Sequence, residues 1–517
     1  MGSPAKVVEI ANNAQIIEQN DEVKDVELKI KNRQSNELII ALCGLVGSGV
    51  RKLKDSLIEE FENLNYKVKH IRISELIAEQ QEKPEEIKKL TGYSRYETLQ
   101  NLGDELRKSN TNNICAQLAI RRINIWRDSV YGEKLKENER PKHAKTLDKI
   151  VYIIDQLKNP AEVSLFRTVY KNNFYLIGLL RNSNERERNL KDDGLDDSDI
   201  KVLMSRDRKN KDSYGQQVED TIQLSDYFIR NIEQIKEINN SVKRFISLVH
   251  GVNHITPTRD ETGIFTAYNS SLRSACLSRQ VGACIVDDNG NILSTGCNDV
   301  PRFNGGLYTS EDSIDNRCHN SGRCFNDLHK SILKKQITEI LQLEGIEDPE
   351  RLSSKIMKST KAKYIIEYSR AIHAEMDAIM SLARSTSVST VGKTMYCTTY
   401  PCHNCARHIV AAGIKRVVYI EPYEKSLARD LHNDAICHTD DITENKVLFA
   451  NFEGVSPSRY PSFFRYHGKR KDDQGYVWRE KMITAKQVDP SGLDSYFDYE
   501  AKTVADVNAL LGEERTE

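Results

Sequence analysis

Residue types that bind metals, together with one carboxylate, occur in two short motifs of this chain. The first motif places Glu375 two residues after His373, and the second places Cys402 and Cys405 three positions apart. Zinc binds imidazole nitrogen and thiolate sulfur, and three protein ligands leave its fourth tetrahedral position open for water, as in catalytic zinc sites. The spacing therefore predicts a catalytic zinc site with His373, Cys402 and Cys405 as the ligands.

The carboxylate gives this site its predicted chemistry. Bound zinc lowers the pKa of a water from about 15.7 to near 7, and Glu375 would carry protons from that water to the substrate and to a leaving amine. A helix that starts at Cys402 would favour the thiolates through its dipole. The order H-x-E and then P-C-x-x-C resembles the signature of zinc nucleobase deaminases. A Cys-x-x-C pair alone would also fit half of a zinc ribbon, but the two motifs together favour the deaminase.

The second half of the chain has the pattern of a sheet covered by helices. An Asn-Gly pair at 289–290, between alternating runs at 281–286 and 292–295, predicts a β-hairpin. A long insertion follows at about 301–369. The pattern then predicts a helix from His373, a strand at 394–399, a helix from Cys402 to Gly413 and a strand at 416–420. We therefore expect an α-β-α domain of the cytidine-deaminase kind.

The first half of the chain predicts an α/β fold with a mostly parallel sheet. Apolar patterns indicate a strand at 37–47, a helix at 50–64 and strands at 66–73, 150–154 and 174–180. Residues 182–211 are so dense in charge that we expect a mobile, solvated segment there. The expected divisions are an N-terminal extension at 1–36, a first domain at 37–255 and a second domain at 256–517.

A glycine-rich segment follows the first predicted strand. Residues 44–51 align with the phosphate-binding loop G-x-x-x-x-G-K-[ST], with candidate nucleotide-binding residues Gly44, Gly47, Ser48, Gly49, Val50 and Arg51. Val50 and Arg51 replace the lysine and the hydroxyl residue, so ordinary phosphoryl transfer is doubtful. Backbone amides at a helix start still suit phosphate. Together with the segments 153–163, 174–178 and 225–229, this half resembles small nucleotide kinases, which implies a P-loop kinase-like domain that binds a nucleotide or a regulatory RNA or protein.

The second half resembles the deoxycytidylate deaminase branch of the cytidine deaminase family, on the segments 279–283, 296–298 and 373–375. The resemblance implies that Asn298 binds the sugar, that Arg279 meets the phosphate and that Ala374 lines the pocket. Tyr423 and Lys425, after the last predicted strand, are further candidates for substrate binding, with a plain surface loop as the alternative. Many relatives carry glutamate at the position of Tyr400.

The insertion carries four more residues of metal-binding type. Deoxycytidylate deaminases often hold a second, structural zinc here, which makes candidates of Cys318, His319, Cys324 and His329. Buried cysteines of a cytosolic protein are commonly plain core residues, so this second zinc stays one of two alternatives.

The two-domain arrangement resembles the bacterial anti-phage dCTP deaminases. That resemblance implies conversion of dCTP, dCMP or both to the uracil nucleotides with release of ammonia, loss of the dCTP pool during infection, and a homo-oligomer. Composition agrees with a cytoplasmic protein that does not enter a membrane, because the 517 residues contain no long apolar run. The alternatives are a polynucleotide cytidine deaminase, which the net charge of −1 disfavours, and a nucleotide-sensing regulatory protein.

Overall fold

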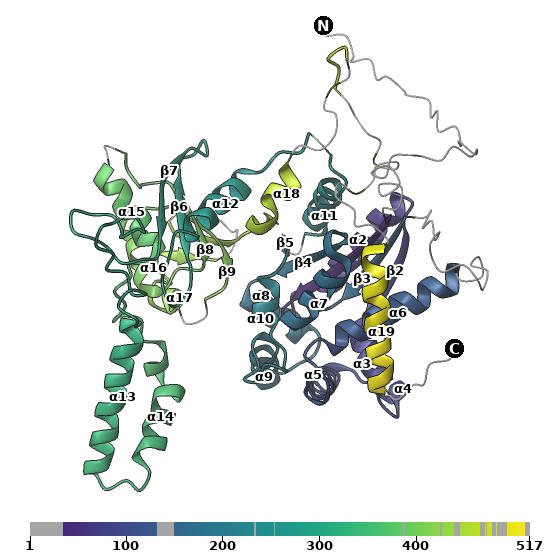
Figure 1. Cartoon of the computed structure of the whole chain (residues 1–517), viewed down its shortest axis with the longest axis horizontal. Helices are drawn as coiled ribbons and strands as arrows, with labels where there is room; N and C mark the ends of the chain where they lie inside the picture. The colour runs from purple at the N-terminus through teal and green to yellow at the C-terminus, as the bar shows by residue number, and fades with distance from the viewer. Residues whose placement is uncertain are drawn as a thin grey trace.

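Two α/β units make up the described part of the chain (Figure 1). The computed structural model describes residues 35–131, 149–231, 234–252, 254–385, 388–423, 426–438, 445–465, 471, 473–477, 482, 487 and 494–511. Each unit contains a six-stranded sheet in which most strands run parallel. The predicted mixed α/β class is therefore confirmed, whereas the kinase-like nature of the first unit stays a prediction.

The first unit is built around one strand that is buried on both faces. Strand β1 (Glu37–Gly44) lies between β3 (Ile150–Asp155) and β4 (Phe174–Leu180). Successive side chains of a strand point to opposite faces, so Ile39, Ala41 and Cys43 join one apolar cluster while Leu38, Ile40 and Leu42 join the other. A continuous apolar run is typical of a parallel strand covered by helices on both sides.

The remaining elements of the first unit follow the apolar pattern. In chain order they are α2 (Val50–Asn63), β2 (Lys67–Arg72), α3 (Ile73–Glu79), α4 (Pro84–Lys88), α5 (Gly92–Ser109), α6 (Ile114–Tyr131), α7 (Pro160–Tyr170), α8 (Ser183–Asp192), α9 (Asp197–Arg208), α10 (Val218–Ile222), β5 (Tyr227–Arg230) and α11 (Ile235–Val249). The sheet order is β5-β4-β1-β3-β2, all parallel. Asn159 and Glu162 begin α7 with a capping box, which satisfies backbone amides at the helix start.

The charged segment at 182–211 differs from its prediction. We expected mobile, solvated chain, but it forms the helices α8 and α9. Leu190, Ile200 and Leu203 are buried there in a small cluster with Val46. These apolar side chains are few and lie at helical spacing among many charged residues. The average composition of the segment therefore remains highly charged and hides the helical pattern.

The second unit carries both metal motifs. Its elements are α12 (Arg259–Ser271), β6 (Gly282–Val286), β7 (Ile292–Cys297), α13 (Phe325–Leu343), α14 (Pro349–Ser359), α15 (Ala374–Ser385), β8 (Thr394–Thr399), α16 (His403–Ala411), β9 (Arg416–Glu421), α17 (Ala428–Leu431), β10 (Ile436–Cys437) and β11 (Val447–Asn451). The sheet order is β10-β11-β9-β8-β6-β7, and β6 and β7 form the antiparallel hairpin that the Asn-Gly pair predicts. Helices α13 and α14 of the insertion project from this unit (Figure 1).

The chain returns to the first unit after β11. Strand β12 (Gly454–Val455) pairs antiparallel with β5, α18 (Tyr460–Phe464) contacts α11, and α19 (Asp494–Leu511) packs on α6. The predicted second domain, 256–517, includes these segments. They contact the first unit, but Tyr460 of α18 also stacks on Phe265 of α12, so the division near residue 256 stays a prediction. Strand β12 has only two residues and pairs with a strand far away in the sequence. No local sequence pattern predicts such a pairing.

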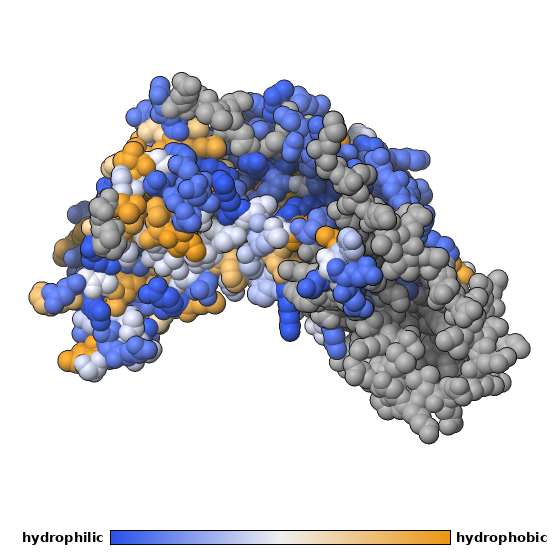
Figure 2. All heavy atoms as spheres, turned by 90° about the horizontal axis from the view of Figure 1, so that it is seen from above, coloured by the Kyte–Doolittle hydropathy of each residue, from blue (hydrophilic) through white to orange (hydrophobic). Residues whose placement is uncertain are grey.

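On the face that Figure 2 shows, the described parts of the two units differ in hydropathy. Seen from above, apolar residues gather on the second unit, whereas the described face of the first unit is largely hydrophilic (Figure 2). Among the described residues, none of the helices combines the length and apolar character that crossing a bilayer requires.

A buried ion triad holds the C-terminal helix. Arg127 of α6 donates to Glu37 at 2.8 and 2.9 Å and to Glu500 of α19, and all three side chains are almost fully buried. We predict that Arg127→Met lowers the free energy of unfolding by about 3–5 kcal/mol, because two buried carboxylates lose their counter-charge. Urea unfolding followed by tryptophan fluorescence measures this change. The control Arg122→Met, on the exposed side of the same helix, should change stability by about 0–1 kcal/mol, and equal losses in the two variants would contradict the role of the triad.

Candidate active site

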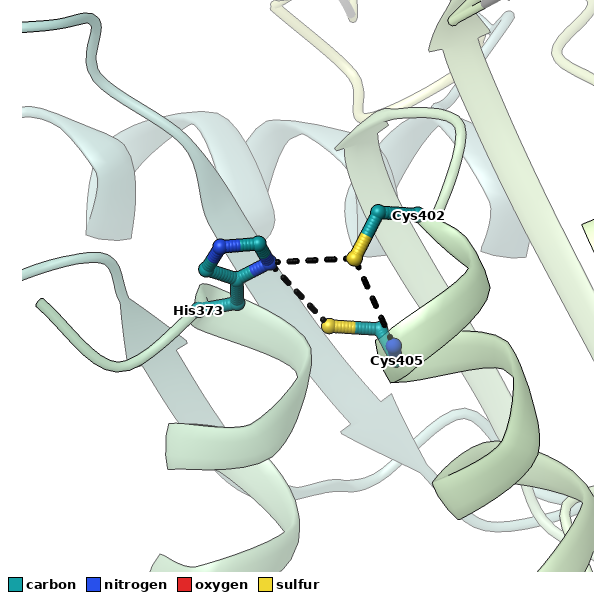
Figure 3. Close-up of side chains that lie close together, drawn as sticks. All are labelled: His373, Cys402 and Cys405. Carbon is teal, nitrogen blue, oxygen red and sulfur yellow. Dashed lines mark hydrogen bonds between the residues drawn. The ribbon is translucent and has the colours of Figure 1, made fainter. Parts of the chain in front are cut away.

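Three metal-ligating side chains meet in the second unit (Figure 3). The Nδ1 atom of His373 lies 3.3 Å from the Sγ atom of Cys402 and 3.4 Å from that of Cys405. Within the described ranges, this is the one group whose three ligand atoms all lie within 4.8 Å of one another. The structure therefore brings together the three residues that the sequence predicts as zinc ligands.

Helix starts position these ligands. Cys402 is the N-cap of α16, and its sulfur accepts a hydrogen bond from the backbone N–H of Cys405 at 3.4 Å. His373 immediately precedes α15, and the backbone N–H of Ile372 donates to the carbonyl of Asp299 at 3.0 Å. Both cysteines thus lie at the positive end of a helix, where thiolates are stabilised.

A glycine lets α15 approach the sheet closely. A Cβ atom at Gly296 would lie 2.2 Å from the carbonyl oxygen of Ala374 and 2.4 Å from the backbone nitrogen of Ala378. The Asp377 carboxylate accepts a hydrogen bond from the backbone N–H of Cys297 at 3.1 Å. Strand β7 therefore fixes the first turn of α15, which carries Glu375. A larger residue at position 296 would push this turn away from the sheet.

Zinc binding would displace protons from this group, because hydrogen bonds with Cys402 raise the pKa of both the Cys405 thiol and the His373 imidazole. The hydrogen bond with Cys405 lowers the pKa of Cys402 to about 4, so Cys402 is a thiolate at neutral pH. The hydrogen bond with Cys402 raises the pKa of His373 to about 9. Metal binding releases protons from such ligands. One nitrogen and two sulfur donors, almost buried and at helix N-termini, fit zinc with one position left for water.

Glu375 lies in the first turn of α15 and is 4% exposed. Burial raises the pKa of its carboxyl above the ordinary value. A carboxyl whose pKa is shifted toward neutrality can both accept and donate a proton, which a proton shuttle requires.

A catalytic pocket of about 160 Å³ opens beside these residues. In addition to His373, Cys402 and Glu375, it is lined by Ala374, Asn298, Arg279 and Tyr423, as the sequence predicts. The side chain of Asn298 accepts from the backbone N–H of Val281 at 2.7 Å and donates to the carbonyl of Arg279 at 2.8 Å. An amide group has two N–H donors, so one donor of Asn298 remains for a ligand. Lys425 lies outside the described residues.

Arg279 has an internal partner, Glu421, that no motif in the sequence indicates. Its guanidinium donates to Glu421 at 3.2 Å and to the hydroxyl of Thr399. Its carbon Cζ also lies 5.8 Å from the centre of the Tyr423 ring. A substrate phosphate at Arg279 would therefore compete with Glu421. The partners stand 142 positions apart, a distance over which no spacing rule operates.

Tyr400 is a further pocket residue, and its neighbours explain its position. Its hydroxyl lies 2.8 Å from the Nε2 atom of His438, and the two rings stack with centres 5.8 Å apart. Burial lowers the pKa of His438 to about 4, so its imidazole is neutral at pH 7. Tyr400 thus forms a neutral, fixed wall of the pocket.

Two of the candidate residues for a second zinc, Cys318 and Cys324, interact with each other, whereas the two histidines have other partners. The thiol of Cys318 interacts electrostatically with those of Cys276 and Cys324. The Nε2 atom of His319 lies 3.7 Å from Asp315, and the ring of His329 packs against Tyr368. In the described part of the chain these four residues do not form a group comparable to the first site. The second zinc stays a prediction.

The glycine-rich segment at 44–51 lies in the first unit, between β1 and α2. Gly47 and Gly49 have φ values of +79° and +83°, which glycine adopts without strain. The backbone N–H of Val46 donates to Asp207 at 2.7 Å. A phosphate in this loop would compete with that carboxylate, so nucleotide binding by Gly44, Gly47, Ser48, Gly49, Val50 and Arg51 also stays a prediction.

Comparison with known proteins gives a consistent result for the second unit. The family model of the cytidine and deoxycytidylate deaminase zinc-binding region matches residues 257–421. The deoxycytidylate deaminase of Enterobacteria phage T4 is 33% identical over 192 residues, which are 37% of this chain and 93% of that protein. The corresponding enzyme of Enterobacteria phage T2 is 36% identical over 160 residues, 31% of this chain and 78% of that protein. The crystal structure of the dCMP deaminase from cyanophage S-TIM5 aligns with 38% of this chain and all of its own, at 21% identity and a TM-score of 0.22.

The site and the sequence relatives define a zinc-binding hydrolytic deaminase. His373, the two cysteines and the buried glutamate all lie inside the matched region. The chain belongs to the cytidine and deoxycytidylate deaminase family.

The metal site leads to a direct prediction. Cys402→Ser should lower the zinc content of the purified protein by one equivalent per chain, because a serine hydroxyl is a poor replacement for a thiolate ligand. Elemental analysis by plasma mass spectrometry measures the content. His408→Ala, a change on the same helix outside the ligand set, serves as the control and should retain the metal. Full zinc content in a folded Cys402→Ser protein would contradict the assignment.

Proposed function

We propose that this protein hydrolyses the exocyclic amine of free deoxycytidine nucleotides, converting dCTP, dCMP or both to dUTP or dUMP with release of ammonia. The observation that carries the proposal is the buried Glu375, which lines one small pocket with His373 and Cys402 of the group formed by His373, Cys402 and Cys405. The phage relatives named deoxycytidylate deaminase support the nucleotide class. We further propose that this reaction depletes dCTP during phage infection, a role that the two-domain resemblance supports.

In the proposed reaction three residues would hold zinc and Glu375 would transfer protons. Zinc held by His373, Cys402 and Cys405 would lower the pKa of water toward 7. Glu375 accepts a proton from the water and donates it to the ring nitrogen N3 next to the attacked carbon C4. The water oxygen forms a bond to C4. Glu375 then takes the remaining proton from that oxygen and donates it to the amine as the bond between C4 and the amine nitrogen breaks. Water and cytosine thus become uracil and ammonia.

The walls of the pocket favour a free nucleotide over a polynucleotide. Arg279 is the one arginine or lysine among the described residues that line the pocket, and it is paired with Glu421. Proteins that bind single-stranded nucleic acid need a basic groove with several aromatic stacking residues. The remaining donor of Asn298 suits a single sugar hydroxyl. The regulatory alternative has less support, because the ligands and Glu375 are all in place for catalysis.

If Glu375 transfers protons, replacing its carboxylate by an amide of the same size should cause a large loss of activity. Glu375→Gln should lower kcat for deamination of dCTP or dCMP about 10²–10⁴-fold, since the amide cannot shuttle a proton. Ammonia release and chromatography of the nucleotide products measure the loss. The variant should keep its zinc, and Glu344→Gln at the far end of α13 is the matched control. A Glu375→Gln protein with wild-type kcat would contradict the mechanism.

The same pair of proteins tests the proposed role in cells. Expression of the wild type should lower the dCTP pool and the plaque count on phage infection, whereas Glu375→Gln should leave both unchanged. Equal protection against phage by the wild type and Glu375→Gln would show that any defence role does not depend on deamination.

The proposed substrate class predicts a defined order of activity. We expect dCTP or dCMP to react faster than CTP or deoxycytidine, and single-stranded DNA to give no uracil. Initial rates on all five substrates at equal cytosine concentration establish this order. Turnover of DNA alone would favour the polynucleotide deaminase instead.

A further inference from the structure

A second and larger cavity lies between the two units. Its volume is about 580 Å³, within the range of roughly 300–1,000 Å³ that is usual for small-molecule sites, which often occur at domain interfaces. Its walls include Leu45 after β1, Leu180 at the end of β4 and Ile420 in β9. The carboxyl ends of parallel strands from both sheets therefore face it, which is where ligands bind in open α/β sheets. We call it the interdomain cavity.

The lining of the interdomain cavity combines three kinds of groups. Cationic side chains come from separate elements: Arg181 and Arg186 near the start of α8, Lys201 and Arg208 on α9, and Arg429 on α17. Acidic side chains also line the cavity, of which Glu185 lies 3.7 Å from Arg181 and Glu219 lies 3.2 Å from Arg208. The rings of Tyr400, Tyr419 and Tyr423 form an aromatic wall.

Each kind of group has a counterpart in one class of ligand. Guanidinium and ammonium groups bind phosphates, and the first turn of α8, which also lines the cavity, favours anions through its dipole. Carboxylates accept hydrogen bonds from sugar hydroxyls, as in dinucleotide sites, and aromatic rings stack on bases. A purely inorganic anion would use only the cations.

The interdomain cavity shares a wall with the catalytic pocket. Tyr400 and Tyr423 line both spaces. Asn182, at the start of α8, donates to the carbonyl of His438 at 2.7 Å, and His438 holds the hydroxyl of Tyr400. Arg429 donates to the hydroxyl of Ser183 at 3.1 Å. A ligand on the first turn of α8 therefore contacts the element that fixes the catalytic wall.

We infer that the interdomain cavity binds a nucleotide other than the one being deaminated, and that its occupancy changes deamination through Tyr400. The phosphates lie against Lys201, Arg429 and the start of α8, and the base lies toward the tyrosines. The binding part is independent of the proposed substrate, whereas the kinetic part rests on the proposed function.

Calorimetric titration of the full chain with ATP tests the binding part. ATP should bind, and saturating dCMP should leave that binding in place. Lys201→Ala and Arg429→Ala should each weaken it about tenfold, the effect of losing one charged hydrogen bond. The controls Lys335→Ala and Arg351→Ala, on the projecting helices, should bind ATP like the wild type. Tripolyphosphate should bind more weakly than ATP.

Several outcomes would overturn the inference. They are absence of ATP binding at millimolar concentration, equal affinity in the cavity variants and the wild type, complete competition by dCMP, or tripolyphosphate binding as tight as that of ATP. Because these readouts do not use deamination, their failure is distinct from failure of the proposed function.

Steady-state kinetics with dCMP test the coupling. ATP should change kcat or KM of the wild type. Tyr400→Phe lacks the hydroxyl that His438 holds, so it should bind ATP with similar affinity but show a smaller kinetic response relative to its own basal rate. An unchanged response in Tyr400→Phe, or no response in a wild type that binds ATP, would overturn the route through Tyr400.

Discussion

The close approach of two sulfur atoms and a buried carboxylate to one imidazole is the constraint on which the second unit depends. Like charges in a buried place repel unless cations or helix dipoles offset them. The fold meets this need by starting α15 and α16 at the same point, so that both helix N-termini face the group. The contact of Gly296 with α15 then sets the distance between them.

Local motifs and neighbouring elements could be predicted from the sequence, whereas contacts across the fold could not. His373, Cys402 and Cys405 meet because each motif starts a helix beside a predicted strand, and the hairpin follows from one Asn-Gly pair. The membership in the deaminase family followed from the same motifs. The ion pair of Arg279 could not be predicted because Glu421 is distant in the sequence. Helix α9 could not be predicted because its charged residues outnumber the buried apolar side chains that pack it against the first unit.

The two units are joined by more than a linker. Glu261 of α12 is fully buried, and its carboxylate accepts from Arg244 of α11 at 2.6 Å and from the backbone N–H of Val455 in β12 at 3.0 Å. Phe452, just before β12, packs against Phe228 in the first sheet. The apolar cluster around these rings includes residues of both units. A cut at the predicted boundary near residue 256 would expose this shared core.

The return of the chain to the first sheet also sets an order of events during synthesis. Strand β5 leaves the ribosome more than 200 residues before β12, its antiparallel neighbour. Nascent chains fold from the N-terminus as residues emerge, so one edge of the first sheet stays without its last strand while the whole deaminase unit is being made. An open sheet edge pairs readily with other chains. Completion of the first unit therefore waits for translation of the second.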